Sequence, residues 1–344
     1  MKRVSEHSKR GKYVFQGKVD LKGRKQGRGV EKQEDWEIWA NFVNNKPHGK
    51  VELRFTDDQS YAYSTMIKGK LHGHYELYNA KGVKVFECEY VNGIKHGIGY
   101  EILKGECMIK GTWQNNEFEG KDNTFLYPDG TYIQGEWVEG MLMTGAYYTP
   151  GGKKIKNVKI DEVTREEMPE HKHDIDPYEK KTVIVKSAGK MGEGLYAKRD
   201  IWKGTLVSLY SGVLVPHYVV DRRRWEFNDN TIECDEKLSL DVPKPYHLTK
   251  NYSASLGHKA NHSFEPNSLY TYLDHPKFGD IMSVIATKDI KKGEEILVNY
   301  GYSKHSHGPP WFRDAKKEFK DKQKRLSRKR KGMKVEFHSK RQKT

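Results

Sequence analysis

The first half of the chain alternates short apolar, aromatic segments with glycine-rich polar turns. In segments such as 85–90 and 132–137, apolar and polar positions alternate, which is typical of strands that bury one face. Turns such as Asn79-Ala80-Lys81-Gly82 separate these segments. The pattern predicts β-hairpins over 13–148. Because a single hairpin is marginal in water, consecutive hairpins must stack to bury their aromatic faces.

A glycine anchor marks the repeat, at spacings of 22 to 25 residues. A regular period in this range is the signature of a repeat architecture. His48, His72 and His96 each precede an anchor. They could bind a metal or pack the turns of successive hairpins, and the second interpretation is favoured because each lies on a separate hairpin. The anchors are Gly27, Gly49, Gly73, Gly97, Gly120 and Gly145.

The second half of the chain has a different character. Charged, irregular sequence at 149–180 predicts a connector or a short extra strand. After it, apolar runs bounded by turns predict short strands, and one helical candidate lies at 217–225. We therefore expect a second, mostly β domain with few helices. The predicted strands lie at 182–185, 205–210, 232–240 and 281–286.

Two segments of this half are too polar and irregular for packing alone. Residues 257–267 place seven hydrogen-bonding side chains among glycine and proline, so neither a helical nor a strand period can be kept. Residues 293–302 contain a turn, a short apolar strand and two tyrosines around Gly301. These two segments indicate a functional site.

A glycine-rich loop at 187–197 offers a third candidate. Gly192, Gly194 and Ala197 fit the spacing of the dinucleotide-binding fingerprint after a strand. That fingerprint requires a helix next, whereas 198–204 is a charged turn that ends in glycine. Two interpretations remain: a tight loop whose backbone N–H groups approach a ligand, or an ordinary turn.

Positive charge is concentrated at the two ends of the chain. The net charge is +15, of which residues 305–344 hold +11 and residues 1–12 hold +4, so the body between them is neutral. The basic run 322–331 is dense enough for a nuclear-import signal or a loose nucleic-acid contact. The alternative is a solvated, disordered end.

Cysteine spacing and hydropathy indicate the compartment of the protein and its relation to membranes. Cys88, Cys107 and Cys234 lie far apart and form no metal-binding or disulfide spacing, which favours a reducing compartment and predicts no metal site. No apolar run approaches the roughly 20 residues of a membrane span, and the basic start is not followed by a signal-peptide segment. We expect a soluble intracellular monomer.

The repeat resembles MORN repeats, whose mark is Tyr-x-Gly, a spacer and then His-Gly. Residues 192–195, 261–267 and 293–301 match, in order and spacing, the three signature segments of SET-domain protein-lysine methyltransferases. With the repeat upstream, the chain resembles the MORN-SET monomethyltransferases of the histone lysine-4 type, a class of chromatin and transcription regulators.

The resemblance implies a mostly β fold: a stack of hairpin repeats, then a SET β-fold with a pseudoknot, then a short C-terminal helix. In the pseudoknot, the segment after Asn261 threads under the strand leading to Tyr300. The implied organisation is a basic tail at 1–12, the MORN array at 13–148, a linker at 149–180, the SET domain at 181–303, an aromatic helix at 304–320 and a basic disordered tail at 321–344.

Methyl transfer from S-adenosylmethionine to lysine is an in-line displacement, so catalysis is mostly positioning. The amine must be neutral, and an apolar channel and the positive sulfonium both lower its pKa. By the resemblance, Tyr300, Tyr210 and Tyr270 are catalytic, and a tyrosine at position 270 restricts the product to monomethyl-lysine. The implied substrate-binding residues are Tyr210, Asp221, Asn230, Thr231, Tyr270, Tyr300 and Tyr302.

The resemblance also implies a cofactor site. The sequence differs from relatives at three points. No cysteine follows Cys234, so the zinc-bound lid of many relatives is absent. Ala315 replaces an acidic residue on the aromatic helix of Trp311 and Phe319, and Met282 replaces a lysine near the substrate groove. Hydrogen bonding is the expected role of His262, rather than general base, and Lys259 hydrogen-bonds within the site. The implied cofactor-binding residues are Met191, Gly192, Glu193, Asn261, His262 and Trp311.

Two functions from different classes fit these features. The first is a protein-lysine methyltransferase of the nucleus and chromosome, with the cytoplasm as a second compartment, acting on a histone tail or another lysine-containing protein. The second is a scaffold whose repeats and basic tails bind partners, nucleic acid or lipid while the SET half is inactive. Intact Asn261, His262 and Tyr300 favour the enzyme, because an inactive site has no physical reason to keep polar residues in a core.

Overall fold

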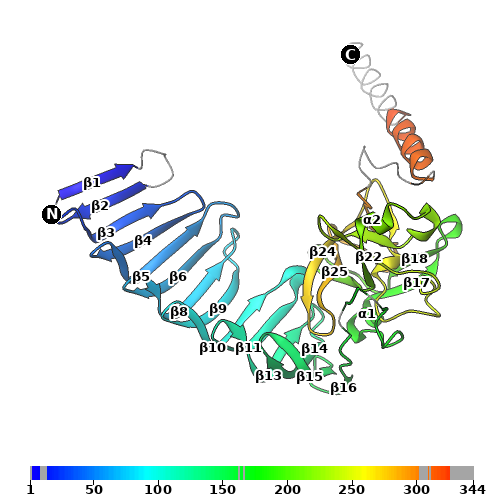
Figure 1. Ribbon diagram of the computed structural model, residues 1–344, viewed down its shortest axis with the longest axis horizontal. Helices are drawn as coiled ribbons and strands as arrows, with labels where there is room; N and C mark the ends of the chain where they lie inside the picture. The colour runs from blue at the N-terminus through cyan, green and yellow to red at the C-terminus, as the bar shows by residue number, and fades with distance from the viewer. Residues whose placement is uncertain are drawn as a thin grey trace, which may run out of the picture. The chain divides into compact units, whose positions relative to one another are not determined.

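The computed structural model describes residues 2–7, 14–161, 163–165, 167–301, 309 and 311–325, with the backbone alone at 2–7. The chain divides into two compact units (Figure 1). Unit 1 comprises Met1–Glu162, Gly204–Leu206 and Tyr272–Ile281, and unit 2 comprises Val163–Lys203, Val207–Thr271 and Met282–Thr344. The division does not follow the sequence, because two short pieces of the second half belong to unit 1.

Unit 1 is built on one antiparallel sheet, in which each long strand pairs with the strands before and after it in sequence (Figure 1). This order confirms the predicted array of consecutive hairpins. The described strands are β1 (Lys2–His7), β2 (Val14–Val19), β3 (Lys25–Lys32), β4 (Trp36–Val43), β5 (Lys46–Phe55), β6 (Tyr61–Ile67), β7 (Lys70–Leu71), β8 (Gly73–Tyr78), β9 (Lys84–Val91), β10 (Ile94–Ile102), β11 (Met108–Gln114), β12 (Glu117–Phe118), β13 (Gly120–Leu126), β14 (Tyr132–Val138), β15 (Met141–Tyr148) and β16 (Lys154–Asn157), with a 3-10 turn at Lys104–Glu106.

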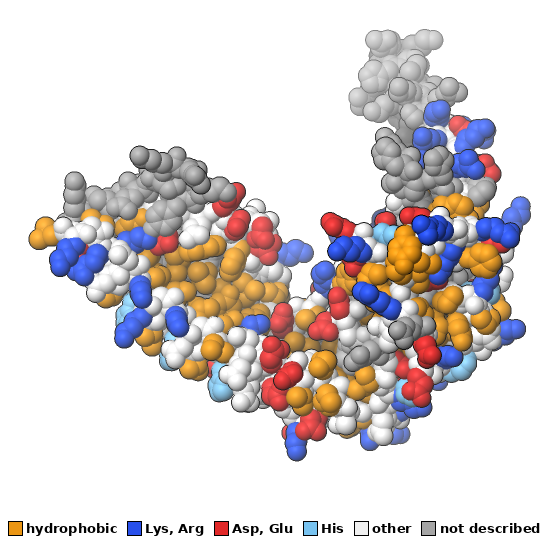
Figure 2. All heavy atoms as spheres, in the orientation of Figure 1, with side chains coloured by type: hydrophobic (Ala, Val, Ile, Leu, Met, Phe, Trp, Pro, Cys, Tyr) orange, Lys and Arg blue, Asp and Glu red, His pale blue; other side chains and the backbone are white. Residues whose placement is uncertain are grey.

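Alternation along the strands gives the sheet its apolar face. In β4, Ile38, Ala40 and Phe42 are buried, whereas Trp39 between them is exposed. Figure 2 shows hydrophobic side chains gathered over the strands of this unit. Rings of neighbouring strands pack against one another, which removes apolar surface from water. One such row consists of Tyr75, Phe86, Trp113, Phe118 and Trp137, with successive ring centroids 4.8 to 6.2 Å apart.

Anchor glycines of the repeat lie where the register of strand pairing shifts, Gly49 within β5 and Gly97 within β10. Gly49, Gly73 and Gly97 have φ angles of 81°, 85° and 77°, a backbone conformation that other residues rarely adopt. The histidine before the anchor packs the next turn: Nδ1 of His48 accepts a long hydrogen bond of 3.5 Å from Lys68 N. His72 accepts one of 3.4 Å from the equivalent N–H, that of Asn92. These contacts agree with the turn-packing interpretation of the histidines.

The described part of unit 1 contains one group of side chains that could hold a metal ion: His74, Glu76 and Glu87, which face solvent at least in part. Lys84 already pairs with both carboxylates of this group. The Lys84 ammonium therefore occupies the position that a metal ion would take between these carboxylates.

Additional strands lie at both ends of the array. The range 1–12, predicted as a tail, contains β1, which pairs antiparallel with β2 along its full length. The range 149–180, predicted as a connector or a short extra strand, contains the short strand β16, which pairs with β15, and most of the helix α1 (Pro177–Thr182). The physical reason for the added strands is that each end of an open sheet presents unpaired N–H and C=O groups, which an adjoining segment can satisfy.

Residues 272–281 complete unit 1 with buried polar contacts. The hydroxyl of Tyr127, at the end of β13, lies 2.7 Å from Nε2 of His275. Lys277 is fully buried, and its ammonium lies 4.0 Å from a carboxylate oxygen of Asp161. No local pattern in the sequence predicts these pairs, since their members are more than 100 residues apart.

Unit 2 is assembled from small sheets: β17 with β18, β19 with β25 and β24, β20 with β22 and β21, and β23 with β26. Strands predicted at 182–185, 205–210 and 281–286 are confirmed. The strands are β17 (Val183–Ser187), β18 (Glu193–Ala197), β19 (Leu206–Tyr210), β20 (Val213–Pro216), β21 (Thr231–Glu233), β22 (Leu238–Asp241), β23 (Asn261–His262), β24 (Ser268–His275), β25 (Gly279–Ala286) and β26 (Leu297–Val298), with α2 (His217–Val220), 3-10 turns at Gly189–Met191, Trp225–Phe227 and Gly257–Lys259, and a helix at 311–325.

The pseudoknot joins the signature segments 261–267 and 293–301. β23 pairs in parallel with β26, so that Asn261 stands beside Leu297 and His262 beside Val298. The side chain of Asn267 extends the junction, because its Oδ1 accepts a hydrogen bond of 2.8 Å from Leu297 N. The residues around the junction, including Ile296 and Val298, are buried in the core of unit 2.

Three local predictions for unit 2 were wrong. The strand expected at 232–240 is a hairpin of β21 and β22, because the Asp235 carboxylate accepts hydrogen bonds from Lys237 N and Leu238 N and forms a turn. The helix expected at 217–225 ends at Val220. The helix expected to end at 320 continues to 325 through lysine, aspartate and glutamine, which are compatible with a helix. None of the described helices is both long and apolar enough to cross a membrane.

Candidate active site

A cavity of about 530 Å³ opens among the loops of unit 2. Its volume is in the range of small-molecule sites. Both signature segments and the glycine loop contribute to it, which brings together parts of the chain separated by more than 100 residues. The lining residues are Lys190, Met191, Gly192, Glu193, Trp225, Asn228, Asp229, Asn230, His247, Leu248, His258, Lys259, Asn261, Tyr300, Pro309 and Trp311.

The glycine loop brings bare backbone to the cavity. Ala188 N donates to Gly192 O over 2.7 Å, and Gly192 has a φ of 81°. At Gly194, a Cβ atom would come within 2.9 Å of the side chains of Glu295 and Asn261. The loop is therefore a tight turn against the cavity, and β18 follows it where a dinucleotide site would need a helix.

The amide of Asn261 connects the glycine loop with the signature segment 293–301. Its Nδ2 donates to Oε1 of Glu295 over 2.8 Å and to the backbone oxygen of Glu193 over 3.3 Å. Asn261 is buried, so these bonds are shielded from water and fix the loop relative to β23 and β26.

An ion pair closes one wall of the cavity. The ammonium of Lys259 lies 2.9 Å from Oε2 of Glu193 and also donates to the backbone oxygen of His247. Partial burial by itself would raise the pKa of Glu193, but the Lys259 ammonium and the Thr249 hydroxyl lower it below its usual value. Glu193 is therefore ionised at neutral pH, and Lys259 is held by two acceptors.

Three tyrosine hydroxyls are held by backbone carbonyls. Tyr300 donates to Ala260 O over 2.9 Å, and Tyr210 donates to Asn230 O over 2.8 Å. Tyr270 reaches the oxygen of Gly257 at 3.5 Å, and its ring lies edge-on to that of Tyr210 at 5.7 Å. Burial, and then the nearby Tyr270 and Tyr300, raise the pKa of Tyr210 well above 10.

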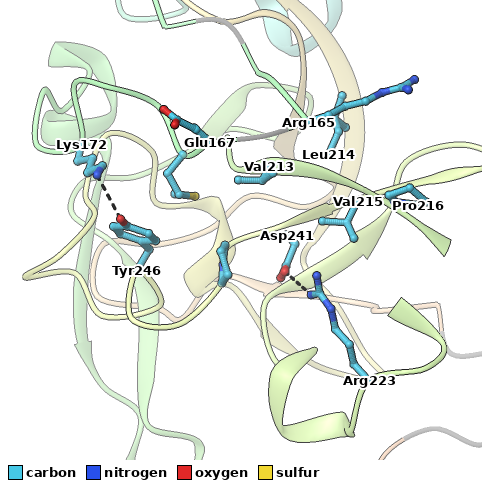
Figure 3. A pocket seen from close by; sticks show the side chains of 12 residues that line it. Arg165, Glu167, Lys172, Val213, Leu214, Val215, Pro216, Arg223, Asp241 and Tyr246 are labelled. Carbon is cyan, nitrogen blue, oxygen red and sulfur yellow. Dashed lines mark hydrogen bonds and ion pairs between the residues drawn. The ribbon is translucent and has the colours of Figure 1, made fainter. Parts of the chain in front are cut away.

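The Asn230 segment is held from behind by a buried carboxylate. Asp241, only 1% exposed, accepts a hydrogen bond of 2.7 Å from the hydroxyl of Thr231 and pairs with Arg223 at 2.6 Å. Figure 3 shows this pair beside a second cavity, of about 570 Å³, on the β20–β22 side of unit 2. The pair therefore fixes β21 next to the carbonyl that holds Tyr210.

His262 belongs to an aromatic cluster. Its Nδ1 accepts a hydrogen bond of 3.2 Å from Tyr300 N, and its ring contacts those of Phe264, Phe312 and Trp311. Burial lowers the pKa of His262 to about 4. The ring is neutral at pH 7, which fits a hydrogen-bonding and packing role.

The structure brings together most of the predicted site residues. Met191, Gly192, Glu193, Asn230, Asn261, Tyr300 and Trp311 line the cavity. Tyr210, Tyr270, Thr231 and His262 stand behind it in the contacts described above. Asp221 is exposed at the end of α2 and does not line the cavity, and Tyr302 lies outside the described residues.

Several lining residues were missed from the sequence. Asn228, His247 and His258 come from segments without a recognisable period, and Trp225 was predicted only as the end of the helix at 217–225. The one available signal was the polarity of 257–267, which contains His258.

The parallel β23–β26 junction, the glycine turn and the clustered tyrosines define a SET domain, and the SET domain family model matches residues 192–301. The histone-lysine N-methyltransferase SETD7 of Halocynthia roretzi is 31% identical over 269 residues, which cover 70% of this chain and 70% of that protein. The chain therefore belongs to the SETD7 family of SET-domain protein-lysine methyltransferases.

Other relatives match a shorter part of the chain. Human histone-lysine N-methyltransferase 2B is 28% identical over 123 residues, which are 36% of this chain and 4% of that protein. The H3 lysine-36 specific histone-lysine N-methyltransferase of Aspergillus oryzae is 29% identical over 129 residues, covering 37% of this chain and 13% of the relative. The SETD7 relative therefore differs from these two in that its similarity extends over most of the chain.

Proposed function

We propose that this protein transfers one methyl group from S-adenosylmethionine to the ε-amine of a lysine in a histone or another nuclear protein. The observation that carries the proposal is the set of tyrosine hydroxyls of Tyr210, Tyr270 and Tyr300, each held by a backbone carbonyl beside a polar cavity. Fixed hydroxyls and carbonyls can orient an amine, and orientation is the main requirement of an in-line displacement.

The residues of the cavity fit the cofactor. The neutral imidazole of His258 is 4% exposed, and neither ring nitrogen makes a hydrogen bond within the described residues. Burial, and then Lys259 and His247, lower its pKa well below 6.5, against a small opposing effect of the Ser255 carbonyl. A buried polar group without a partner is costly, and a polar ligand or water in the cavity would supply one.

Specific groups would hold each part of the cofactor. The bare backbone at 191–193 and the ammonium of Lys259 suit a carboxylate, and the ring of Trp311 suits a flat heterocycle. When bound, S-adenosylmethionine supplies an electrophilic methyl group on a positively charged sulfur. The resemblance implies an acidic residue where Ala315 stands, so this position offers no carboxylate to bind the adenine amine.

The protein's own residues prepare the lysine. Aromatic walls of Tyr210, Tyr270 and Tyr300 exclude water from the amine, which lowers its pKa and favours the neutral, nucleophilic form. The hydroxyl of Tyr300, 2.9 Å from Ala260 O, stands at the cavity where it can orient the reacting nitrogen. The proton leaves to solvent before the transfer.

The number of methyl groups that the lysine receives follows from crowding around its amine. The hydroxyl of Tyr270 and the ring of Tyr210 occupy the space beside the amine, and a methyl group already on the nitrogen would have to displace one of them. This supports a single methyl transfer. Phenylalanine at position 270 would remove the hydroxyl and admit a second methyl.

The substrate class and location extend the same proposal. Histone tails offer accessible lysines, and nuclear localisation on chromatin is proposed from the activity. The basic run 322–331 would assist import or contact nucleic acid; it is described only as far as residue 325, within the terminal helix.

Transfer of labelled methyl to core histones and to a panel of lysine peptides tests the proposal, with Tyr300→Phe as the variant. We expect transfer by the native protein and a loss of at least about 100-fold in the variant, because one fixed hydroxyl orients the amine. Tyr63→Phe, an exposed position in unit 1, is the matched control and should keep full activity. No transfer, and no cofactor binding by calorimetry, would favour the scaffold function instead.

A further inference from the structure

Glu179 is an acidic residue enclosed in the core of unit 2. It lies in α1, whose N-cap is Asp176, and its side chain is 1% exposed. Buried carboxyl groups are rare unless they are paired or coordinate a metal. Among the described residues no cation pairs with Glu179, so the reason for its burial must lie in its hydrogen bonds.

One oxygen of Glu179 joins two segments of the chain. Oε1 accepts hydrogen bonds from Leu209 N over 3.1 Å and from Leu256 N over 2.8 Å. It also accepts a short hydrogen bond from the hydroxyl of Ser208. β19 pairs with β25 on one side. The carboxyl oxygen of Glu179 accepts from Leu209 N a hydrogen bond that the carbonyl of a neighbouring strand would otherwise accept.

The two joined segments carry the tyrosine walls of the proposed active site. Tyr210 follows Leu209 directly, and Gly257, which follows Leu256, supplies the carbonyl for Tyr270. The segments are in close contact: a Cβ atom at Gly257 would come within 2.6 Å of Leu209 O. A change in their spacing would therefore move the Tyr210 ring relative to the Tyr270 hydroxyl.

We propose that Glu179 is a positioning residue, which sets the distance between Tyr210 and Tyr270 and thereby the rate and the product state of methyl transfer. This inference rests on the proposed function. Glu179 does not line the cavity, so it acts through the two backbone segments and touches neither lysine nor cofactor.

The carboxyl also gives the arrangement a pH dependence. Burial, with a further contribution from Asp176, raises the pKa of Glu179 to about 8, against hydrogen bonds from Ser208, Leu256 and Leu209 that lower it. Oε2 has no hydrogen-bond partner within the described residues. Ionisation would place a negative charge, shared by the two oxygens, in a buried site where no described cation pairs with it, so the neutral form fits the site better than the ionised form.

Three variants test the inference. Glu179→Gln keeps an acceptor oxygen and cannot ionise, Glu179→Ala removes the bridge, and Glu236→Gln changes an exposed glutamate as the control. We expect Glu179→Gln to match native kcat at about pH 7, and to exceed it as pH rises to about 9. We expect Glu179→Ala to lose about tenfold in kcat, with the KM for cofactor unchanged, because only the tyrosine walls move. Mass spectrometry should show dimethyl-lysine from Glu179→Ala.

A purely structural role would lower the melting temperature of Glu179→Ala while leaving the kcat per folded molecule and the single methylation unchanged, and this result would overturn the inference. A native protein that transfers no methyl would instead refute the proposed function. In that case NMR of ring-labelled tyrosines decides: the Tyr210 and Tyr270 signals, assigned by phenylalanine substitution, should shift between about pH 7 and 9 in the native chain and stay fixed in Glu179→Gln. Fixed signals in both would contradict the positioning role.

Discussion

In the repeat sheet of unit 1 the contacts run between neighbours in sequence, whereas in unit 2 the important contacts join segments far apart. Each strand of the repeat sheet pairs with the next, and rings such as Phe118 and Trp137 pack across adjacent hairpins. In unit 2, Asn261 contacts Glu295, and Glu179 contacts Leu256. The repeat region relies on apolar rings, and the site region on buried polar pairs that fix backbone carbonyls.

This difference predicts which substitutions should destabilise each unit most. The ring of Trp113 is 2% exposed in the aromatic row of unit 1. Trp113→Ala should cost about 3–5 kcal/mol, because the cavity cannot close in a sheet of fixed spacing. Hydrogen exchange of unit 1 amides in the intact protein measures the loss. Trp39→Ala, at a position that is 46% exposed, should cost less than about 1 kcal/mol. Equal effects would contradict the importance of the row.

In unit 2 the corresponding experiment breaks an ion pair. Arg223→Ala leaves the carboxylate of Asp241 buried without its cation, and should cost about 3 kcal/mol. Arg224→Ala is the control, since that side chain is 80% exposed and should change stability by less than about 0.5 kcal/mol. Denaturant unfolding compares them. A small effect of Arg223→Ala would show that Asp241 is satisfied by Thr231 alone.

The hydrogen bond between Tyr127 and His275 tests how much the segment 272–281 contributes to the stability of unit 1. Tyr127→Phe removes the hydroxyl that meets Nε2 of His275. The expected loss is about 1 kcal/mol, because the imidazole is left buried with one contact fewer. Thermal unfolding of Tyr127→Phe beside Tyr63→Phe, whose hydroxyl is exposed, gives the measurement. Identical melting temperatures would show that this bond contributes nothing.

The smallest predicted effect is a pH slope in unit 2. The folded chain keeps His262 neutral down to about pH 4, whereas the unfolded chain protonates it near pH 6.5. Between these values the unfolded state binds more protons, so stability is lost as pH falls through this window. His262→Phe keeps the aromatic packing and should reduce that loss. An unchanged slope in denaturant titrations would show that His262 protonates freely in the fold.

Much of unit 1 could be predicted, because its information is local. The glycine period and the alternation at 85–90 specify hairpins without knowledge of distant contacts. The hairpin tip 272–281 could not be assigned to unit 1, since the His275 and Lys277 contacts depend on partners far away in sequence. The hairpin of β21 and β22 was predicted as a single strand at 232–240, because apolar and polar residues alternate on both sides of the turn at Asp235.

For the site, short signature segments indicated Asn261 and Tyr300 and left out their supports. Glu179 and Asp241 are separate acidic residues in ordinary sequence, and only the fold shows that each is buried and hydrogen-bonded beside the site. Resemblance identifies residues that meet the ligand. The residues that hold them in place became visible with the three-dimensional contacts.

The most direct test of the account is the mass of a peptide lysine after exhaustive reaction with S-adenosylmethionine, for the native chain and for Tyr270→Phe. The account predicts that the native chain stops at one methyl and that Tyr270→Phe adds a second. Dimethyl-lysine from the native chain, or no methyl transfer by either protein, would contradict it.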